Sequence, residues 1–110
     1  MENTPHKGQY RWMIYRDDKE WVGAVLEFNI VIVGDDRDIV SHELQEAALG
    51  YIESARKIKG FRPRVVNPTL NQASDPELER LWEDAYEARI KRTPFPSNIF
   101  DFGARNLALV

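Results

Sequence analysis

The feature that most constrains this chain is a change in the spacing of its apolar residues. Between residues 10 and 33 they alternate with polar residues or form short β-branched runs, which is typical of β-strands. Between residues 40 and 58 they recur every three or four positions, which is typical of one buried face of a helix. The sequence therefore predicts an α+β domain in which strands precede a long helix.

The first part of the chain predicts three strands. They cover residues 10–15, 21–28 and 30–33. The charged turn at residues 16–20 joins the first two as an antiparallel hairpin. One face of the second strand is predicted to carry Val22, Ala24, Leu26 and Phe28. Asn29 tolerates a positive φ, so we expect a tight reversal or a bulge there.

The helix that follows is predicted over residues 36–59. Asp36 can cap it, because a carboxylate at this position accepts hydrogen bonds from the first free N–H groups. Gly60 stands where a glycine commonly ends a helix. Residues 61–66 predict a fourth strand, part of which Pro63 would confine to a sheet edge.

A second helix is predicted over residues 76–92. Asp75 precedes it and Pro76 takes its first position, where proline loses no hydrogen bond. The residues after it, 98–110, form an unusually apolar tail. A free apolar tail favours aggregation, so we expect it to dock on its own domain or on another chain.

Together these elements predict a three- or four-stranded, mainly antiparallel sheet packed by one long helix. A chain of 110 residues is one domain by size. We divide it into a flexible tail (1–9), a core (10–66) and a C-terminal helix with the apolar tail (67–110). This last region would pack on the core or on another subunit.

Composition excludes several classes of protein. With no cysteine there is no disulfide scaffold, thiolate metal site or cysteine nucleophile. A net charge of −3 and a pI near 5.4 make nucleic acid an unlikely partner. No apolar run has the length of a membrane span, and the first residues lack the apolar segment of a signal peptide. We therefore expect a cytoplasmic protein that does not bind membranes.

The segment WVGAVLEFNIV, from Trp21 to Val31, leads into Gly34-Asp35-Asp36 and the spaced residues Leu44, Glu46 and Ala47. This pattern resembles that of the HicB-like antitoxin domains over about residues 10–66. Two features depart from the family. Phe28-Asn29 replaces its proline-glycine, and its DNA-binding module is not recognisable here.

The resemblance implies a partly RNase H-like α+β fold without the catalytic acids. Proteins of this family bind and block a small basic ribonuclease, many of them form oligomers, and others have no evident toxin. The resemblance thus implies an antitoxin or a stand-alone regulator that is a likely homo-oligomer. Because the DNA-binding module is missing, it does not imply regulation of transcription.

The candidate partner-binding residues are aromatic. Phe95, Phe100 and Phe102 belong to the proline-flanked, apolar end of the chain, and Trp21 to the second strand. Large aromatic side chains often anchor protein interfaces. They also often form ordinary core or cross-strand contacts, so the sequence leaves docking within the chain and docking on a partner both open.

The alternative function is a small RNA-binding domain. Five basic residues and no acid lie within residues 55–64, namely Arg56, Lys57, Lys59, Arg62 and Arg64. Together with nearby aromatic residues they could bind RNA. Cations are also favoured at a helix C-terminus, which explains the run without any ligand.

We predict no enzyme, no metal and no cofactor. His42-Glu43-Leu44-Gln45-Glu46 begins like a zinc-protease motif, but Glu46 stands where the second histidine is needed. No glycine-rich phosphate loop and no serine nucleophile motif are present. Glu27, the one acid inside a predicted strand, is expected on an outward face or an edge.

Overall fold

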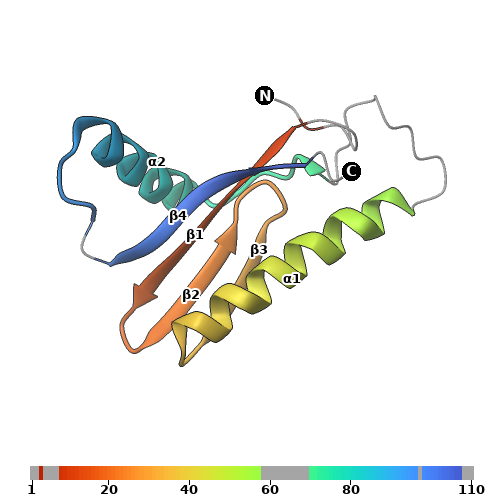
Figure 1. The fold of residues 1–110 in the computed structure, drawn as a ribbon, viewed down its shortest axis with the longest axis horizontal. Helices are drawn as coiled ribbons and strands as arrows, with labels where there is room; N and C mark the ends of the chain where they lie inside the picture. The colour runs from red at the N-terminus through yellow and green to blue at the C-terminus, as the bar shows by residue number, and fades with distance from the viewer. Residues whose placement is uncertain (1–2, 4–7, 58–69, 97, 108–110) are drawn as a thin grey trace.

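The computed structural model describes residues 3, 8–57, 70–96 and 98–107. It shows an α+β fold with a four-stranded antiparallel sheet and two helices (Figure 1), as predicted. The elements are β1 (Gln9–Asp17), β2 (Glu20–Val25), β3 (Ile30–Gly34), α1 (Arg37–Arg56), α2 (Pro76–Lys91) and β4 (Ile99–Asn106). The strand predicted at residues 61–66 and the helix end predicted at Gly60 lie outside the described residues.

The fourth strand comes from the apolar end of the chain. The strand order is β3-β2-β1-β4, and β4 pairs antiparallel with β1. The register runs from Gln9 opposite Asn106 to Ile14 opposite Asp101, and then Tyr15 lies opposite Ile99. Phe100 is therefore an extra residue in β4, and the strand has a β-bulge there.

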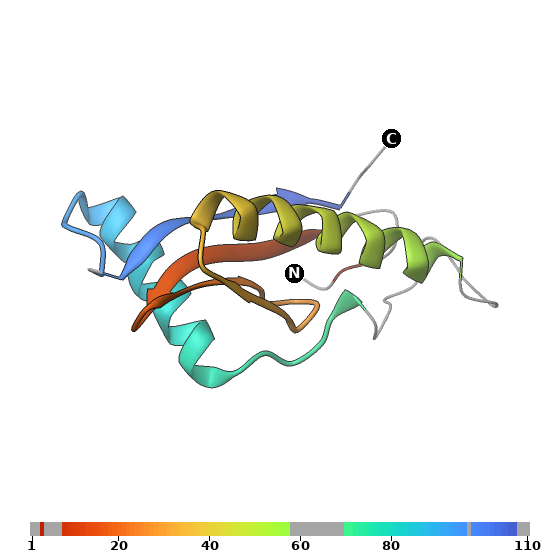
Figure 2. The ribbon, with the colours of Figure 1, turned by 90° about the horizontal axis from the view of Figure 1, so that it is seen from below.

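The two helices cover opposite faces of the sheet (Figure 2). Successive side chains of β1 alternate between them, as expected for a strand. Tyr10 and Ile14 join the core beneath α1, whereas Met13 joins the core beneath α2. From the helices, the first core takes Val40, Leu44, Ala48, Ile52 and Ala55, and the second takes Trp82 and Ala85.

The turn between β2 and β3 corrects one prediction. The strand β2 ends at Val25, and a reversal with Asn29 at φ 54° follows. Leu26 stays in the core beneath α2, but Phe28 crosses to the core beneath α1. There its ring stacks on Tyr51 at 4.8 Å. The prediction that Phe28 shares a face with Leu26 was wrong, because the reversal rotates the chain between them.

Both helix starts agree with their predicted caps. The Asp36 carboxylate accepts hydrogen bonds from the backbone N–H groups of Asp38 and Ile39, at 2.8 and 3.2 Å. The Asp75 carboxylate accepts one from Glu77, and Pro76 is the first residue of α2.

A polar contact joins the start of the chain to the segment before α2. Asn3 is fully buried, and its amide nitrogen donates to the Leu70 carbonyl at 2.9 Å. Its Oδ1 accepts from the backbone N–H of Gln9 at 2.8 Å. Gly8 has φ 146°, and a Cβ there would lie 2.1 Å from Asn3 Oδ1. Only glycine therefore fits at this position.

Two glycines allow a test of how tightly α1 packs on the sheet. A Cβ on Gly23 would lie 3.0 to 3.1 Å from side-chain atoms of Val40 and Leu44, whereas a Cβ on Gly50 would meet nothing within 4 Å. We expect Gly23→Val to lower the free energy of unfolding by about 1–3 kcal/mol through overpacking. Gly50→Ala should raise it by about 0.5–1 kcal/mol, because alanine is the better helix former. Chemical denaturation measures both, and equal effects of the two variants would contradict the described packing.

Candidate protein-interaction surface

Arg11 is the centre of the most extensive polar network in the described residues. Its guanidinium donates to the carboxylates of Glu27 and Glu79 at distances from 2.6 to 2.9 Å. The Glu79 carboxylate also accepts from the Ser74 hydroxyl at 2.6 Å, and Glu83 lies 3.8 Å from Arg11. The network thus joins β1, the turn after β2 and the first turns of α2.

The network favours the ionised forms of Arg11 and Glu79. Hydrogen bonds from Arg11 lower the pKa of Glu79, against the opposing effect of burial. Burial alone would lower the pKa of Arg11, but the hydrogen bonds with Glu79 and Glu27 outweigh it and raise that pKa. A carboxylate held in this way is a poor general acid, because it does not carry a proton near neutral pH. Glu27 is thus a structural partner of Arg11 and not an outward-facing residue.

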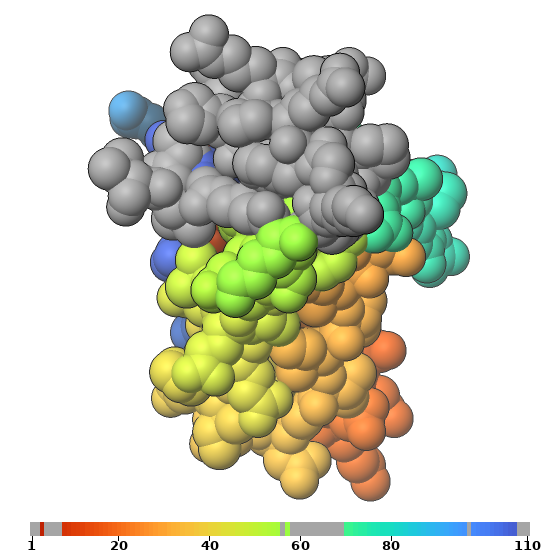
Figure 3. All heavy atoms as spheres, turned by 90° about the vertical axis from the view of Figure 1, so that its right-hand side faces the viewer, coloured from red at the N-terminus to blue at the C-terminus, as the bar shows by residue number. Residues whose placement is uncertain are grey.

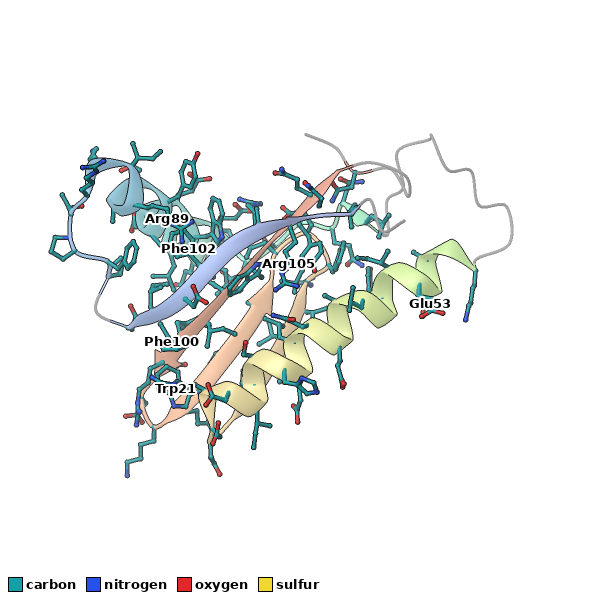
Figure 4. The ribbon with its side chains drawn as sticks, viewed as in Figure 1. Trp21, Glu53, Arg89, Phe100, Phe102 and Arg105 are labelled. Carbon is teal, nitrogen blue, oxygen red and sulfur yellow. The ribbon has the colours of Figure 1, made fainter. Side chains whose placement is uncertain are left out.

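Two of the predicted partner-binding residues meet on the α1 face of the sheet. The bulge turns Phe100 toward Trp21, and their rings lie edge to face with centroids 5.9 Å apart. Arg37 at the start of α1 lies 4.2 Å above the Phe100 ring, and Arg16 lies 5.2 Å from the Trp21 ring. We call these four residues the Trp21–Phe100 cluster. Figure 4 shows its two rings side by side at one end of the sheet.

The Trp21–Phe100 cluster is open to solvent and has an acidic rim. The side chain of Phe100 is 44% exposed. The β1–β2 turn beside Trp21 and the start of α1 beside Arg37 are both exposed and rich in acids. The six acids are Asp17, Asp18, Glu20, Asp35, Asp36 and Asp38, against the three bases Arg16, Lys19 and Arg37. This end of the molecule therefore combines an exposed phenylalanine ring and a half-buried tryptophan ring with a net negative charge.

The other two predicted residues lie together elsewhere, against α2. Phe102 is only 3% exposed, and its ring packs edge to face on Trp82. Arg89 lies 4.1 Å over the same ring (Figure 4). Phe95 contacts Phe102 at 5.5 Å and remains 44% exposed beside an open hollow of about 350 Å³. The structure thus places Phe102 in the core and Phe95 at its rim.

A narrow cleft separates α1 from the β1–β4 side of the sheet. Its floor includes Trp12, which lies against Gly103 of β4, and Arg105 stands at its edge. Burial raises the pKa of Tyr10 in this floor, and Arg105 partly offsets the effect. The free space is about 10 Å³, which is room for one water molecule. The cleft is therefore too small to hold a substrate as it stands.

The basic run is largely outside the described residues. Lys59, Arg62 and Arg64 are among the residues that the structure does not describe, and Arg56 is the last residue of α1. Lys57 is exposed, and its ammonium lies 3.3 Å from the Glu53 carboxylate one turn earlier in α1. Lys57 therefore forms an ordinary ion pair at the end of α1.

Sequence reasoning missed Arg11, Arg16 and Arg37. The alternation of β1 places Arg11 on the same face as Met13, so a charged residue among core positions was the available signal. Its partners are 16 and 68 residues away along the chain, and no local pattern connects them.

Acid titration should reveal the role of Glu79. Its pKa is lower in the folded chain, so its contribution is complete above its unfolded pKa of about 4.3 and is lost as the pH falls further. We expect Glu79→Gln to lower the free energy of unfolding at pH 7 by about 1 kcal/mol, since the side chain is 38% exposed. The difference from the unmodified chain should shrink below about pH 4. Denaturation at a series of pH values measures it.

The matched control is Glu83→Gln. This residue is on the same helix, but it is more exposed and has one contact with Arg11, at 3.8 Å. We expect a change within about 0.5 kcal/mol at any pH. If the loss of unfolding free energy in Glu79→Gln did not vary with pH, the charge of Glu79 would not be what stabilises the fold.

Among the described residues, no three acidic or histidine side chains lie close enough together to bind a metal ion, and neither helix is long and apolar enough to cross a membrane. Comparison with known proteins found no matching family model, no similar curated protein and no similar solved structure.

Proposed function

We propose that this chain is a non-catalytic, HicB-like protein-interaction domain, acting as an antitoxin or a stand-alone regulator. The Trp21–Phe100 cluster would be its contact surface for a partner protein. The observation that carries the proposal is an exposed phenylalanine ring that packs on a half-buried tryptophan ring, each with an arginine held over it. Tryptophan, other aromatic residues and arginine are enriched where interfaces gain most of their free energy.

The geometry of the cluster favours binding. Each ring is already held by its neighbours, because Trp21 belongs to β2 and Phe100 to β4. A side chain that is held before binding loses little conformational entropy when a partner covers it. The cluster therefore supplies apolar contact area at low cost in free energy.

The acidic rim favours a basic partner. Six acids against three bases lie in the two chain segments next to the rings, and opposite charges speed the encounter of two proteins and select between partners. A small basic ribonuclease, which the HicB-like resemblance suggests, has this chemistry. The same rim disfavours RNA, whose phosphates would meet negative charge.

The buried polar chemistry of the described residues supports a binding role. The two partly buried carboxylates, Glu27 and Glu79, are both engaged by Arg11. Hydrogen bonds from Arg11 lower the pKa of Glu79, whereas a catalytic carboxyl group needs to take up or release a proton near neutral pH. Their use in a structural ion pair supports a domain that binds without catalysis.

Replacement of Phe100 tests this proposal. The tagged chain is used to capture proteins from a native lysate, and the partner found at a fixed ratio is then purified. We expect a small basic protein, and we expect Phe100→Ser to weaken its binding at least about tenfold in calorimetry. The matched control is Ile90→Ser, because Ile90 is 64% exposed on α2, away from the cluster.

Two results would contradict the proposal. One is a partner that binds Phe100→Ser as tightly as the unmodified chain. The other is recovery of RNA whose binding falls steeply with salt and is lost when Arg56, Lys57 and Lys59 are replaced with glutamine, which would favour the RNA-binding alternative.

A further inference from the structure

We propose that the outer edge of β3 pairs with the same edge of a second copy of this chain. The product would be a two-fold symmetric dimer with one continuous antiparallel sheet. This proposal does not depend on the Trp21–Phe100 cluster, because it uses the outer edge of β3 and one flank of α1, and none of the four cluster residues belongs to either.

The strand β3 is an edge strand with no protecting device of its own. It is the outermost strand, and its outer N–H and C=O groups face no other strand among the described residues. Natural edges are commonly protected by charges, proline or a bulge. The sequence of β3 is Ile-Val-Ile-Val-Gly, which has none of these, and Val31 and Val33 are 52% and 51% exposed. Such an edge favours pairing with another strand.

The opposite edge shows the contrast. The strand β4 has a bulge at Phe100, and it carries the exposed charged residues Asp101 and Arg105. These are the usual devices that prevent a strand from pairing with another chain. Among the described residues, therefore, the β3 edge lacks these devices and the β4 edge has them.

The β3 edge is complementary to itself. An antiparallel register centred on Ile32 pairs all five residues of the strand, with Val31 opposite the partner's Val33 on both sides of the axis. Pairs of β-branched side chains across strands are stabilising. In this register Asp35 lies beside the partner's Asn29, whereas a parallel pairing would place the acidic ends of the two strands together. The charge pattern thus favours an antiparallel second copy.

The flank of α1 leaves room for the second copy. Ser41, Gln45 and Ala48 line the cleft on the β1–β4 side of the helix. At about 100° per residue, Ala47 and Gly50 lie on the other flank, toward β3. Gly50 has open space where a Cβ would be. Figure 3 shows this flank of α1 and the strand beside it as one continuous surface.

The spacing of the helices is also suitable. The helix α1 contacts both β2 and β3, so it lies above the edge strand β3 and its neighbour β2. In the dimer the two copies of α1 would be separated by about two strand spacings, or about 9.6 Å. Packed helices are about 8–10 Å apart, and small side chains such as Ala47 permit this distance. The helices would thus add contact area to the paired strands.

One charged residue opposes the pairing. Gly23 pairs with Ile32, and a Cβ on Gly23 would meet Val40 and Leu44. The two-fold axis through Ile32 therefore passes beside the turn of α1 that carries Glu43. In the dimer the Glu43 side chains of the two copies would approach each other. Removal of this like-charge contact should strengthen the dimer.

Oligomeric state is the first test, measured by sedimentation equilibrium on the purified full chain. We expect a monomer–dimer equilibrium whose dissociation constant rises at least about tenfold in Val33→Lys, since a lysine protects an edge strand. Ile90→Lys, on α2, and Phe100→Ser, in the cluster, should both leave it unchanged. Glu43→Gln should lower it.

Single cysteines then test the register, because the chain contains no cysteine of its own. A mixture of Val31→Cys and Val33→Cys chains should form a disulfide between unlike chains, since directly opposed residues are close enough to be joined. A chain that stays monomeric up to about 1 mM would overturn the proposal. A dimer unaffected by Val33→Lys, or cysteines that do not cross-link, would overturn it as well. Loss of partner binding in Phe100→Ser with an intact dimer would bear only on the proposed function.

Discussion

The arrangement of this domain depends on the ion pairs of Arg11. The residue stands on a strand at the centre of the sheet, on the face covered by α2, where a single charge would be costly to bury. Its cost is offset because Glu27 and Glu79 supply carboxylates from two other segments, and Trp82 lies 5.4 Å from the guanidinium. The same contacts place α2 against the sheet and hold the turn after β2. Loss of the arginine would leave two partly buried acids without their partner.

The position of α2 explains which surfaces stay open. The helix packs over β1 and β4, where Met13 and Phe102 form the core, and it leaves Val31 and Val33 of β3 exposed on the same face. On the other face α1 lies over β2 and β3, so the end of β4 that carries Phe100 remains uncovered. In the described part of the chain, two helices on a four-stranded sheet thus leave one open area on each face. The cluster and the β3 edge are these two areas.

Local pattern predicted most of the fold, and long-range contacts account for the rest. Three strands and both helices can be predicted from the spacing of the apolar residues and from the capping residues Asp36 and Asp75. Each of these signals lies within one element. The strand β4 was read as an apolar tail, since its bulge breaks the alternation and its partner is far away in sequence. For the candidate site, the sequence indicated aromatic residues but did not distinguish the exposed Phe100 from the buried Phe102. That distinction depends on the register between β4 and β1. This register is set by pairing between segments far apart in the sequence, so no local pattern reveals it.

The bulge also links recognition to stability. In a regular strand Phe100 would pair with β1 in the place that Ile99 now has. Every residue of β4 before it would then shift by one position, and its side chain would lie on the other face of the sheet. With the extra residue, Ile99 and Phe102 both remain in the core beneath α2, while Phe100 reaches Trp21 on the other face. The exposed ring is thus positioned by the half-buried Ile99 before it and the buried Phe102 after it in the chain. A change that shifted Phe102 within the core would therefore move Phe100 as well, so the exposed cluster depends on the packing beneath α2.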